Sequence, residues 1–157
     1  MMIAISRKVA NPLHLYKAIN QAPLLFAEKL MNTFTHVAVG TNDLDKARMF
    51  YDAVLAPLGL KRIADLGEAG AIWGVDSPSF FVMKPIDGEA ATAGNGVTVS
   101  FVAPSRAAID AFYAAALSAG GIDAGLPGTR DWAPNAYAAY VRDLEGNKLT
   151  AYCFEAE

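Results

Sequence analysis

The sequence predicts an α+β fold made of two similar β-α-β-β-β units, and three observations favour it. A strand-like run, a helix cap, an amphipathic helix and a glycine follow one another between residues 34 and 60. The same pattern recurs 62 residues further along the chain, and short strand-like runs follow each predicted helix. Self-similarity at a fixed offset is the signature of a duplicated unit. We therefore expect one domain over residues 33–157, with a first unit at 33–88 and a second unit at 96–157.

The first copy begins with Thr35–Val39, a short β-branched and apolar run that is typical of a strand. The oxygen side chains of Thr41, Asn42 and Asp43 can accept the free N–H groups at the start of a helix. The helix is expected to end near Gly59, just after a proline. Between these limits, apolar residues recur at the spacing of one helical face: Leu44, Ala47, Tyr51, Val54 and Leu55.

The second copy aligns with the first without a gap. It predicts a strand at Val97–Val102, a cap at Ser105, a helix at Arg106–Ala119 and a stop at Gly120-Gly121. The Phe-Tyr pair of the first helix and the glycine after it both recur at the same offset. Two copies are too few for a solenoid, so the pattern indicates an internal pseudo-twofold.

Three strand-like runs complete each unit. In the first unit they are Lys61–Leu66, Ala71–Val75 and Phe80–Lys84, followed by a polar linker, Pro85–Gly96. In the second unit they are Gly121–Gly125, Ala136–Arg142 and Lys148–Phe154.

Two connections in the second unit carry distinctive residues. The loop Leu126–Pro134 holds Arg130 and Trp132, and loops on a rigid scaffold commonly carry recognition residues. The segment Asp143-Leu-Glu-Gly-Asn147 is predicted to form a tight hairpin, with Gly146 at a positive φ.

Composition excludes several classes of protein. The apolar fraction of 54% and the charged fraction of 18% argue against disorder. A net charge of −3 offers no basic footprint for nucleic acid, and no apolar run is long enough to cross a membrane. The single cysteine, Cys153, excludes an internal disulfide and a cysteine-based zinc cluster, which favours a cytoplasmic location. We expect it to be a small buried residue on the last strand.

Residues 1–32 lie outside the duplicated core and are predicted to form a helical extension. Asn11-Pro12 and Ala22-Pro23 resemble the starts of two short helices. The segment lacks the long apolar core of a secretory signal. Two interpretations remain open: an accessory element that covers the domain or a partner subunit, or an adventitious leader before a natural start at Met31.

Over residues 34–154 the chain resembles the vicinal oxygen chelate superfamily. The resemblance rests on the two units, on His36 of the first strand and on the late Asp143-x-x-Gly-Asn147 turn. This superfamily includes glyoxalase I, extradiol dioxygenases, bleomycin-resistance proteins and fosfomycin-resistance enzymes. The resemblance implies that the eight strands curl into a cup-shaped mixed sheet with the helices outside and the ligand site in the hollow. It also implies a homodimer, which would cover apolar residues of the extension: Leu13, Tyr16, Leu24, Leu25 and Phe26.

The metalloenzymes of this superfamily hold one divalent ion on the first and last strands of each unit. The family-equivalent positions in this chain are His36, Thr98 and Thr150, with Phe81 near the fourth. One imidazole cannot hold a divalent ion, and threonine is a poor substitute for histidine or a carboxylate. We therefore expect no metal cofactor.

The same positions predict a pocket floored by small polar groups and walled by apolar ones. His36 is the candidate catalytic acid or base. The expected ligand-binding residues are His36, Trp73, Phe81, Met83, Thr98, Ser100, Arg130, Trp132, Thr150 and Tyr152.

Three functions remain open on the sequence. The first is a metal-free protein that binds a small organic molecule in the cup, either to sequester it or to act on it through His36. The second is a metal-dependent lyase or dioxygenase with atypical ligands. The third is a non-catalytic interaction module whose cup is filled by its own side chains.

Overall fold

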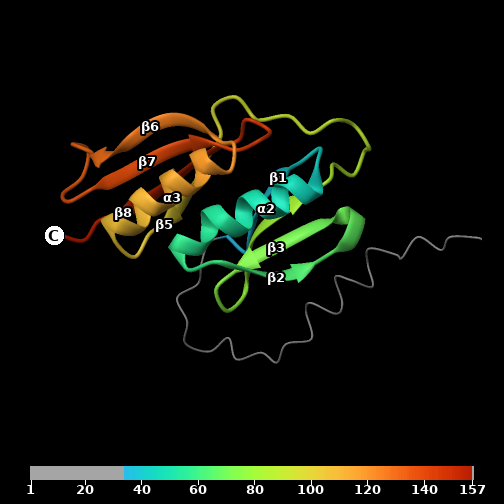
Figure 1. Ribbon diagram of the computed structural model, residues 1–157, viewed down its shortest axis with the longest axis horizontal. Helices are drawn as coiled ribbons and strands as arrows, with labels where there is room; N and C mark the ends of the chain where they lie inside the picture. The colour runs from blue at the N-terminus through green and yellow to red at the C-terminus, as the bar shows by residue number, and fades with distance from the viewer. Residues whose placement is uncertain (1–33, 157) are drawn as a thin grey trace, which may run out of the picture. The chain divides into compact units, whose positions relative to one another are not determined.

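The computed structural model describes residues 34–156 (Figure 1). The predicted helical extension, its two helix starts and its apolar residues lie outside the described part of the chain. Within the described part, no helix is both long and apolar enough to cross a membrane.

The predicted order of elements occurs twice. The first unit contains β1 (Val37–Gly40), α2 (Leu44–Leu55), β2 (Lys61–Asp65), β3 (Gly70–Gly74) and β4 (Pro78–Met83). The second contains β5 (Thr98–Val102), α3 (Arg106–Ser118), β6 (Ile122–Thr129), β7 (Tyr137–Arg142) and β8 (Lys148–Cys153). The predicted β-α-β-β-β duplication is confirmed.

The eight strands of the described region form two separate four-stranded sheets, ordered β1-β4-β3-β2 and β5-β8-β7-β6. In each sheet the first and last strands of the unit pair in parallel, and the other neighbours are antiparallel. Helix α2 packs on the first sheet, helix α3 packs on the second, and the two helices contact each other (Figure 1). The order leaves β1 and β5 as edge strands.

The core lies between the helices and the sheets. Helix α2 contributes Phe50, Val54 and Leu55, and α3 contributes Ile109 and Phe112, all of them buried in one cluster. Strand residues that face the helices complete this cluster, including Trp73, Phe80, Val99, Val141 and Leu149. Each sheet therefore has one face covered by a helix and one face turned away from it, which we call the open face.

The predicted helix ends are confirmed. Asp43 Oδ1 accepts a hydrogen bond of 3.1 Å from the Lys46 amide at the start of α2, and Ser105 Oγ accepts one of 3.1 Å from the Ala108 amide at the start of α3. Gly59 and Gly120 have φ values of 81° and 94°, which side chains other than glycine rarely adopt. These local signals fix where each helix begins and ends.

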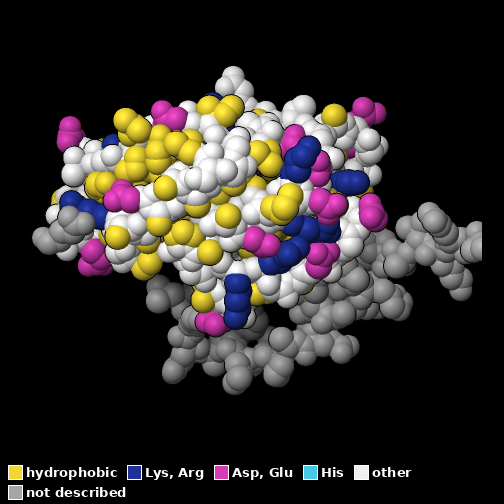
Figure 2. Space-filling view, in the orientation of Figure 1, with side chains coloured by type: hydrophobic (Ala, Val, Ile, Leu, Met, Phe, Trp, Pro, Cys, Tyr) yellow, Lys and Arg dark blue, Asp and Glu magenta, His cyan; other side chains and the backbone are white. Residues whose placement is uncertain are grey.

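The outer faces of the two helices differ. Figure 2 shows charged side chains gathered where α2 and β2 lie, and hydrophobic side chains gathered over α3. Arg48 pairs there with Asp45 and Asp65, both at 2.9 Å. The exposed residues of α3 are mostly small and apolar: Ala107, Ala111, Ala114 and Leu117.

Strand β6 is longer than expected. It extends to Thr129, so residues 126–129 of the predicted loop belong to a strand. Pro127 is tolerated because β6 is an edge strand, where a missing N–H need not break the ladder. The pairing with β7 shifts register around Gly125 and Gly128. Because these bulges interrupt the regular pairing, the composition of residues 126–129 does not indicate a strand.

Candidate ligand-binding site

The predicted ligand-binding residues fall into two groups on different sheets. His36, Phe81 and Met83 lie on or beside the first sheet, next to β1 and β4. Those on or beside the second sheet are Thr98, Ser100, Arg130, Trp132, Thr150 and Tyr152. No strand pairing joins the two sheets in the described region.

Trp73 lies in neither group and corrects the expectation that it lines the pocket. Its side chain is fully buried in the core, where the ring contacts Tyr51 of helix α2. The indole Nε1 donates a hydrogen bond of 3.0 Å to Asp52 Oδ1. Strand phase explains the difference, because residues one step apart face opposite sides of a sheet.

Register across β5, β8 and β7 lines up three rows of side chains on the open face of the second sheet. The residues between them, such as Val99, Leu149 and Val141, point into the core. From one end of the sheet to the other, the rows are Thr98–Lys148–Arg142, Ser100–Thr150–Tyr140 and Val102–Tyr152–Ala138. The face thus changes from cationic through hydroxyl-bearing to aromatic and apolar.

Four aromatic side chains meet on this face, and we call Trp132, Tyr140, Tyr152 and Phe154 the aromatic cluster. Trp132 stands edge-on to Tyr152 and Phe154, with ring centroids 5.4 Å and 5.8 Å apart. Tyr152 stacks on Phe154 and stands edge-on to Tyr140. Trp132 is 60% exposed, so the cluster presents a broad aromatic surface to solvent. Such a surface suits a planar apolar ligand.

Hydroxyl groups lie within the cluster. The hydroxyls of Tyr140 and Tyr152 share a short hydrogen bond. Partial burial and this bond raise the pKa of Tyr152, while the Thr150 hydroxyl and the charge of Arg130 act in the opposite direction. The phenol is therefore protonated at neutral pH and serves as a hydrogen-bonding group rather than a base.

Arg130 has a positioning role. Its guanidinium donates to the carbonyls of Leu126 and Ala138, both at 2.8 Å, and to that of Thr129 at 3.0 Å. It also lies 5.4 Å from the centre of the Tyr140 ring. The side chain joins the irregular end of β6 to β7 and supports the aromatic cluster from one side.

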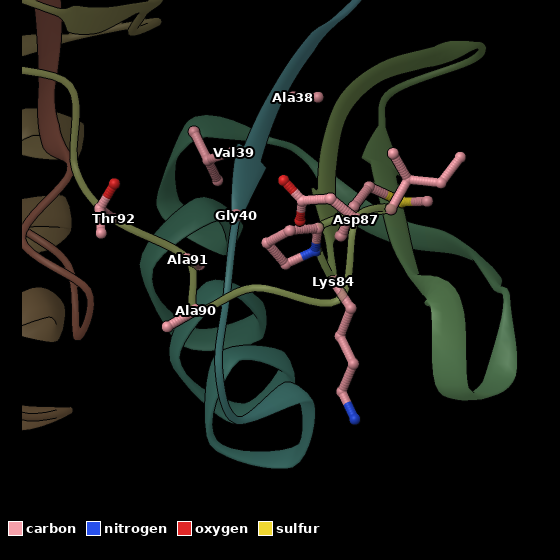
Figure 3. A pocket seen from close by; sticks show the side chains of 11 residues that line it. Ala38, Val39, Gly40, Lys84, Asp87, Ala90, Ala91 and Thr92 are labelled. Atoms are coloured by element: carbon pink, nitrogen blue, oxygen red, sulfur yellow. The ribbon is translucent and has the colours of Figure 1, made fainter.

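The first sheet has a hollow near His36. His36 stacks on Phe81, with centroids 4.2 Å apart, and its Nδ1 lies 3.0 Å from Thr35 Oγ1. Next to this pair, a hollow of about 540 Å³ is lined by β1, the end of β4 including Met83, and part of the linker. Figure 3 shows Ala91 of the linker next to Gly40, while the Lys84 side chain extends away.

The family-equivalent metal positions do not fit a divalent ion. Thr150 is fully buried, and its hydroxyl donates at 2.8 Å to the Ala139 carbonyl. Phe81 offers only a hydrocarbon ring, and Thr98 offers only a hydroxyl. No cluster of three metal-ligating side chains exists among residues 34–156. One imidazole and two hydroxyls are too few and too weak as ligands.

Sequence reasoning missed four residues of the second open face: Tyr140, Arg142, Lys148 and Phe154. A usable signal was present, because the predicted hairpin at Asp143–Asn147 fixes which residues of β7 and β8 stand opposite each other. Counting outward from that turn pairs Arg142 with Lys148 and Tyr140 with Thr150.

The fold and the site define a protein of two β-α-β-β-β units whose open sheet faces carry the candidate ligand-binding groups. The family model for the Glyoxalase/Bleomycin resistance protein/Dioxygenase superfamily matches residues 33–150. The chain belongs to this superfamily.

Solved structures agree with this assignment. A glyoxalase/bleomycin resistance protein from Albidiferax ferrireducens T118 is 40% identical, with a TM-score of 0.69 over 77% of this chain and 98% of that one. A glyoxalase/bleomycin resistance protein/dioxygenase family enzyme from Burkholderia phytofirmans PsJN is 16% identical, with a TM-score of 0.60 over 77% and 98%. Lactoylglutathione lyase from Agrobacterium tumefaciens is 20% identical, with a TM-score of 0.55 over 79% and 95%. The last two show a shared fold. The comparison with curated proteins finds no match.

Proposed function

We propose that this protein binds a small organic molecule with a planar apolar part on the open face of the second sheet, without a divalent metal. The observation that carries the proposal is the aromatic cluster beside the hydroxyls of Ser100, Tyr140 and Tyr152. An apolar surface with a few convergent polar groups is the usual composition of a small-molecule site. The donor set at the family-equivalent metal positions supports the metal-free part.

The chemistry of the face favours binding over a reaction. Tyr152 remains protonated at neutral pH, and the Arg130 guanidinium is engaged with backbone carbonyls. Sequestration of a ligand is therefore the primary proposal. If a reaction does take place, we assign the acid or base role to His36, because imidazole is the commonest general acid or base in enzymes.

We also propose that a second copy of the chain completes the site. In the described region β1 pairs only with β4, and β5 pairs only with β8, so each presents a free edge. Free edges are templates for further strand pairing. A homodimer that places β1 of one protomer beside β5 of its partner would bring His36 and Phe81 next to the row that contains Ser100. The proposed compartment is the cytoplasm, where the free thiol of Cys153 stays reduced.

Sedimentation velocity at tens of micromolar tests the dimer. Val102 is exposed on the β5 edge, and Ile122 is exposed on β6, at the opposite edge of the same sheet. Val102→Lys should produce monomers, and Ile122→Lys should leave the dimer intact. A wild-type protein that sediments only as a monomer contradicts the dimer without touching the binding proposal.

The binding proposal is tested by nuclear magnetic resonance of the isotope-labelled protein with 2-naphthamide, a neutral planar probe. The chain has two tryptophans, so it gives two indole N–H signals. Addition of the probe should shift the Trp132 signal, which Trp132→Phe assigns by its loss, and should leave the Trp73 signal unchanged. Trp73 is a built-in control because it is fully buried in the core.

A matched pair of variants completes the test. Trp132→Ala should weaken binding of 2-naphthamide about fivefold, since stacking on an aromatic ring contributes about 1 kcal/mol. Met49→Ala removes an exposed apolar side chain from helix α2 and should change nothing. No saturable shift of Trp132 at any concentration of the probe, with the fold intact, would favour the interaction module instead.

A further inference from the structure

The first row of the second open face ends in a small polar hollow. Residues 94–98, Arg142 and Lys148 enclose about 260 Å³ at the point where the linker enters β5. The pairs Thr98–Lys148 and Lys148–Arg142 lie directly across neighbouring strands, so these three side chains stand together on one face. Two cations and a hydroxyl therefore line the same hollow.

Neither cation has a carboxylate partner within the part of the chain that the structure describes. Lys148 Nζ lies 4.8 Å from the centre of the Tyr140 ring, and Arg142 Nη1 donates at 2.7 Å to the Gly146 carbonyl. The two carboxylates that follow Arg142 are engaged elsewhere: Asp143 accepts from Tyr51, and Glu145 accepts from Asn42. Most cations of the first sheet and helix α2 are paired instead, as Arg48 and Arg62 show.

The remaining wall of the hollow is a tight turn. The Val97 amide bonds to the Gly94 carbonyl at 3.3 Å, and Gly96 has a φ of 88°. That conformation favours glycine and leaves the wall without a bulky side chain at this point. Asn95 adds an amide group to the lining. All the polar side chains of the hollow can donate hydrogen bonds, and none carries a negative charge.

The hollow is linked to the aromatic cluster through Lys148. Lys148 lies over the Tyr140 ring, Tyr140 bonds to Tyr152, and Tyr152 contacts Trp132. Rows of a strand succeed each other every second residue, at about 7 Å. Tyr140 lies one row from Lys148 and Arg142, so a ligand whose planar part rests beside Tyr140 can place a terminal group between these two cations.

We infer that the hollow formed by Thr98, Arg142, Lys148 and the turn at residues 94–97 binds the anionic group, a carboxylate or phosphate, of an aromatic acid. This inference rests on the proposed function, because it assigns the other end of the same ligand. Arginine and lysine donors form charge-assisted hydrogen bonds with such oxygens, and these are stronger than neutral ones. The substrate class is thus a planar aromatic or unsaturated anion.

Three probes of one shape test the inference: 2-naphthamide, 2-naphthoate and 2-naphthyl phosphate. Affinities are measured by calorimetric titration of the full chain, and the Trp132 indole signal reports contact with the cluster. The two anions should bind about tenfold to a hundredfold more tightly than the amide at low salt. The preference should shrink as ionic strength rises. The better of the two anions distinguishes a carboxylate from a phosphate ligand.

Matched variants show which residues cause the preference for the anions over 2-naphthamide. Lys148→Gln should remove most of the preference for anions, measured as the ratio of anion affinity to 2-naphthamide affinity in the same variant, because the ionic contact is lost. Lys61→Gln carries the same change of net charge on β2 of the first sheet and should behave as wild type. Thr98→Val, which keeps the shape of the side chain, should reduce the preference by a smaller factor. Arg142→Gln is a secondary variant because its side chain also supports the hairpin turn.

The outcomes separate the two proposals. Equal affinity for amide and anions, or an anion preference that survives Lys148→Gln, overturns the inference and leaves ligand binding standing. If none of the three probes shifts the Trp132 signal, the proposed function fails first. Anion binding that shifts no Trp132 signal and is matched by inorganic phosphate alone indicates an adventitious ion only, and it also overturns the inference.

Discussion

The hydroxyl of Tyr51 donates a hydrogen bond of 2.5 Å to the carboxylate of Asp143, and both groups are buried. Tyr51 lies on the helix of the first unit, and Asp143 begins the hairpin turn of the second. Asp143 Oδ1 also accepts from the amides of Glu145 and Asn147, and Asn147 Nδ2 donates to its Oδ2. The Asp-x-x-Gly-Asn turn is therefore fixed from within and anchored to the other unit.

Removal of the Tyr51 hydroxyl should destabilise the protein. Tyr51→Phe leaves a buried carboxylate short of one donor, so the free energy of unfolding should fall by about 1–3 kcal/mol. Tyr113→Phe changes the duplicate position, which is only partly buried, and should cost less. Urea unfolding of both variants measures the difference. Equal decreases in the free energy of unfolding for the two variants would show that the hydrogen bond between Tyr51 and Asp143 has no specific stabilising effect.

The Tyr51 contribution should also depend on pH. Burial and the neighbouring charge of Asp143 raise the pKa of Tyr51 well above its ordinary value of 10.0. Below pH 10 the phenol is protonated in both states, so its stabilisation is fully present. Above pH 10 the unfolded chain releases this proton first, so stability falls as pH rises toward the folded-state pKa. The gap between wild type and Tyr51→Phe should therefore narrow above pH 10 in urea unfolding curves, and a gap that widens contradicts this reading.

Glu145 makes a second link between the units. Its Oε1 accepts at 2.7 Å from the Asn42 amide and at 3.1 Å from Thr41 Oγ1, at the start of α2. A carboxylate at a helix N-terminus is favourable. Glu145→Ala should lower the free energy of unfolding by about 1–2 kcal/mol. Glu68→Ala, at a fully exposed position, should change it by less than about 0.5 kcal/mol. Thermal melting of both variants tests this prediction. Similar melting temperatures for Glu145→Ala and Glu68→Ala would contradict a stabilising role of the Glu145 contacts with the start of α2.

Wild-type protein should not bind zinc stoichiometrically. His36 is the one imidazole among the family-equivalent positions, and a single ligand gives only weak binding. Calorimetric titration with zinc should therefore give the same weak heats for wild type and for His36→Ala. Tight binding with one ion per chain, abolished by His36→Ala, would restore the metal-dependent lyase or dioxygenase as the better hypothesis.

Gly125 should be required for the position of Tyr140. It has a φ of 151°, and a Cβ at this point would lie 3.0 Å from Tyr140 Cδ2. Gly125→Ala should cost about 1–2 kcal/mol of stability and weaken binding of 2-naphthamide, because the Tyr140 ring must move. Gly128→Ala on the same strand meets only the flexible end of Arg130, at 3.3 Å, and should be milder. Chemical denaturation and titration of both variants measure these effects, and a fully stable Gly125→Ala variant contradicts the crowding argument.

Local signals made much of the fold predictable. The caps at Asp43 and Ser105, the glycines that end both helices and the turn glycine Gly146 act within a few residues, so they can be recognised in the chain itself. The offset of 62 holds through the helices and fails within β6, which has eight residues where β2 has five. The connection from β6 to β7 is also longer, with seven residues, 130–136, whereas the matching connection in the first unit has four, 66–69. This longer connection carries Arg130 and Trp132.

The sequence by itself determined the duplicated β-α-β-β-β order and the helix ends, because each depends on residue identity and short-range spacing. Only the tertiary structure decided which side chains share a surface. It moved Trp73 into the core, turned the Arg130 guanidinium toward backbone carbonyls and joined Lys148 and Arg142 to the aromatic cluster. The physical reason is strand phase and register: a shift of one residue reverses the face of a side chain, and pairing between distant strands sets that phase.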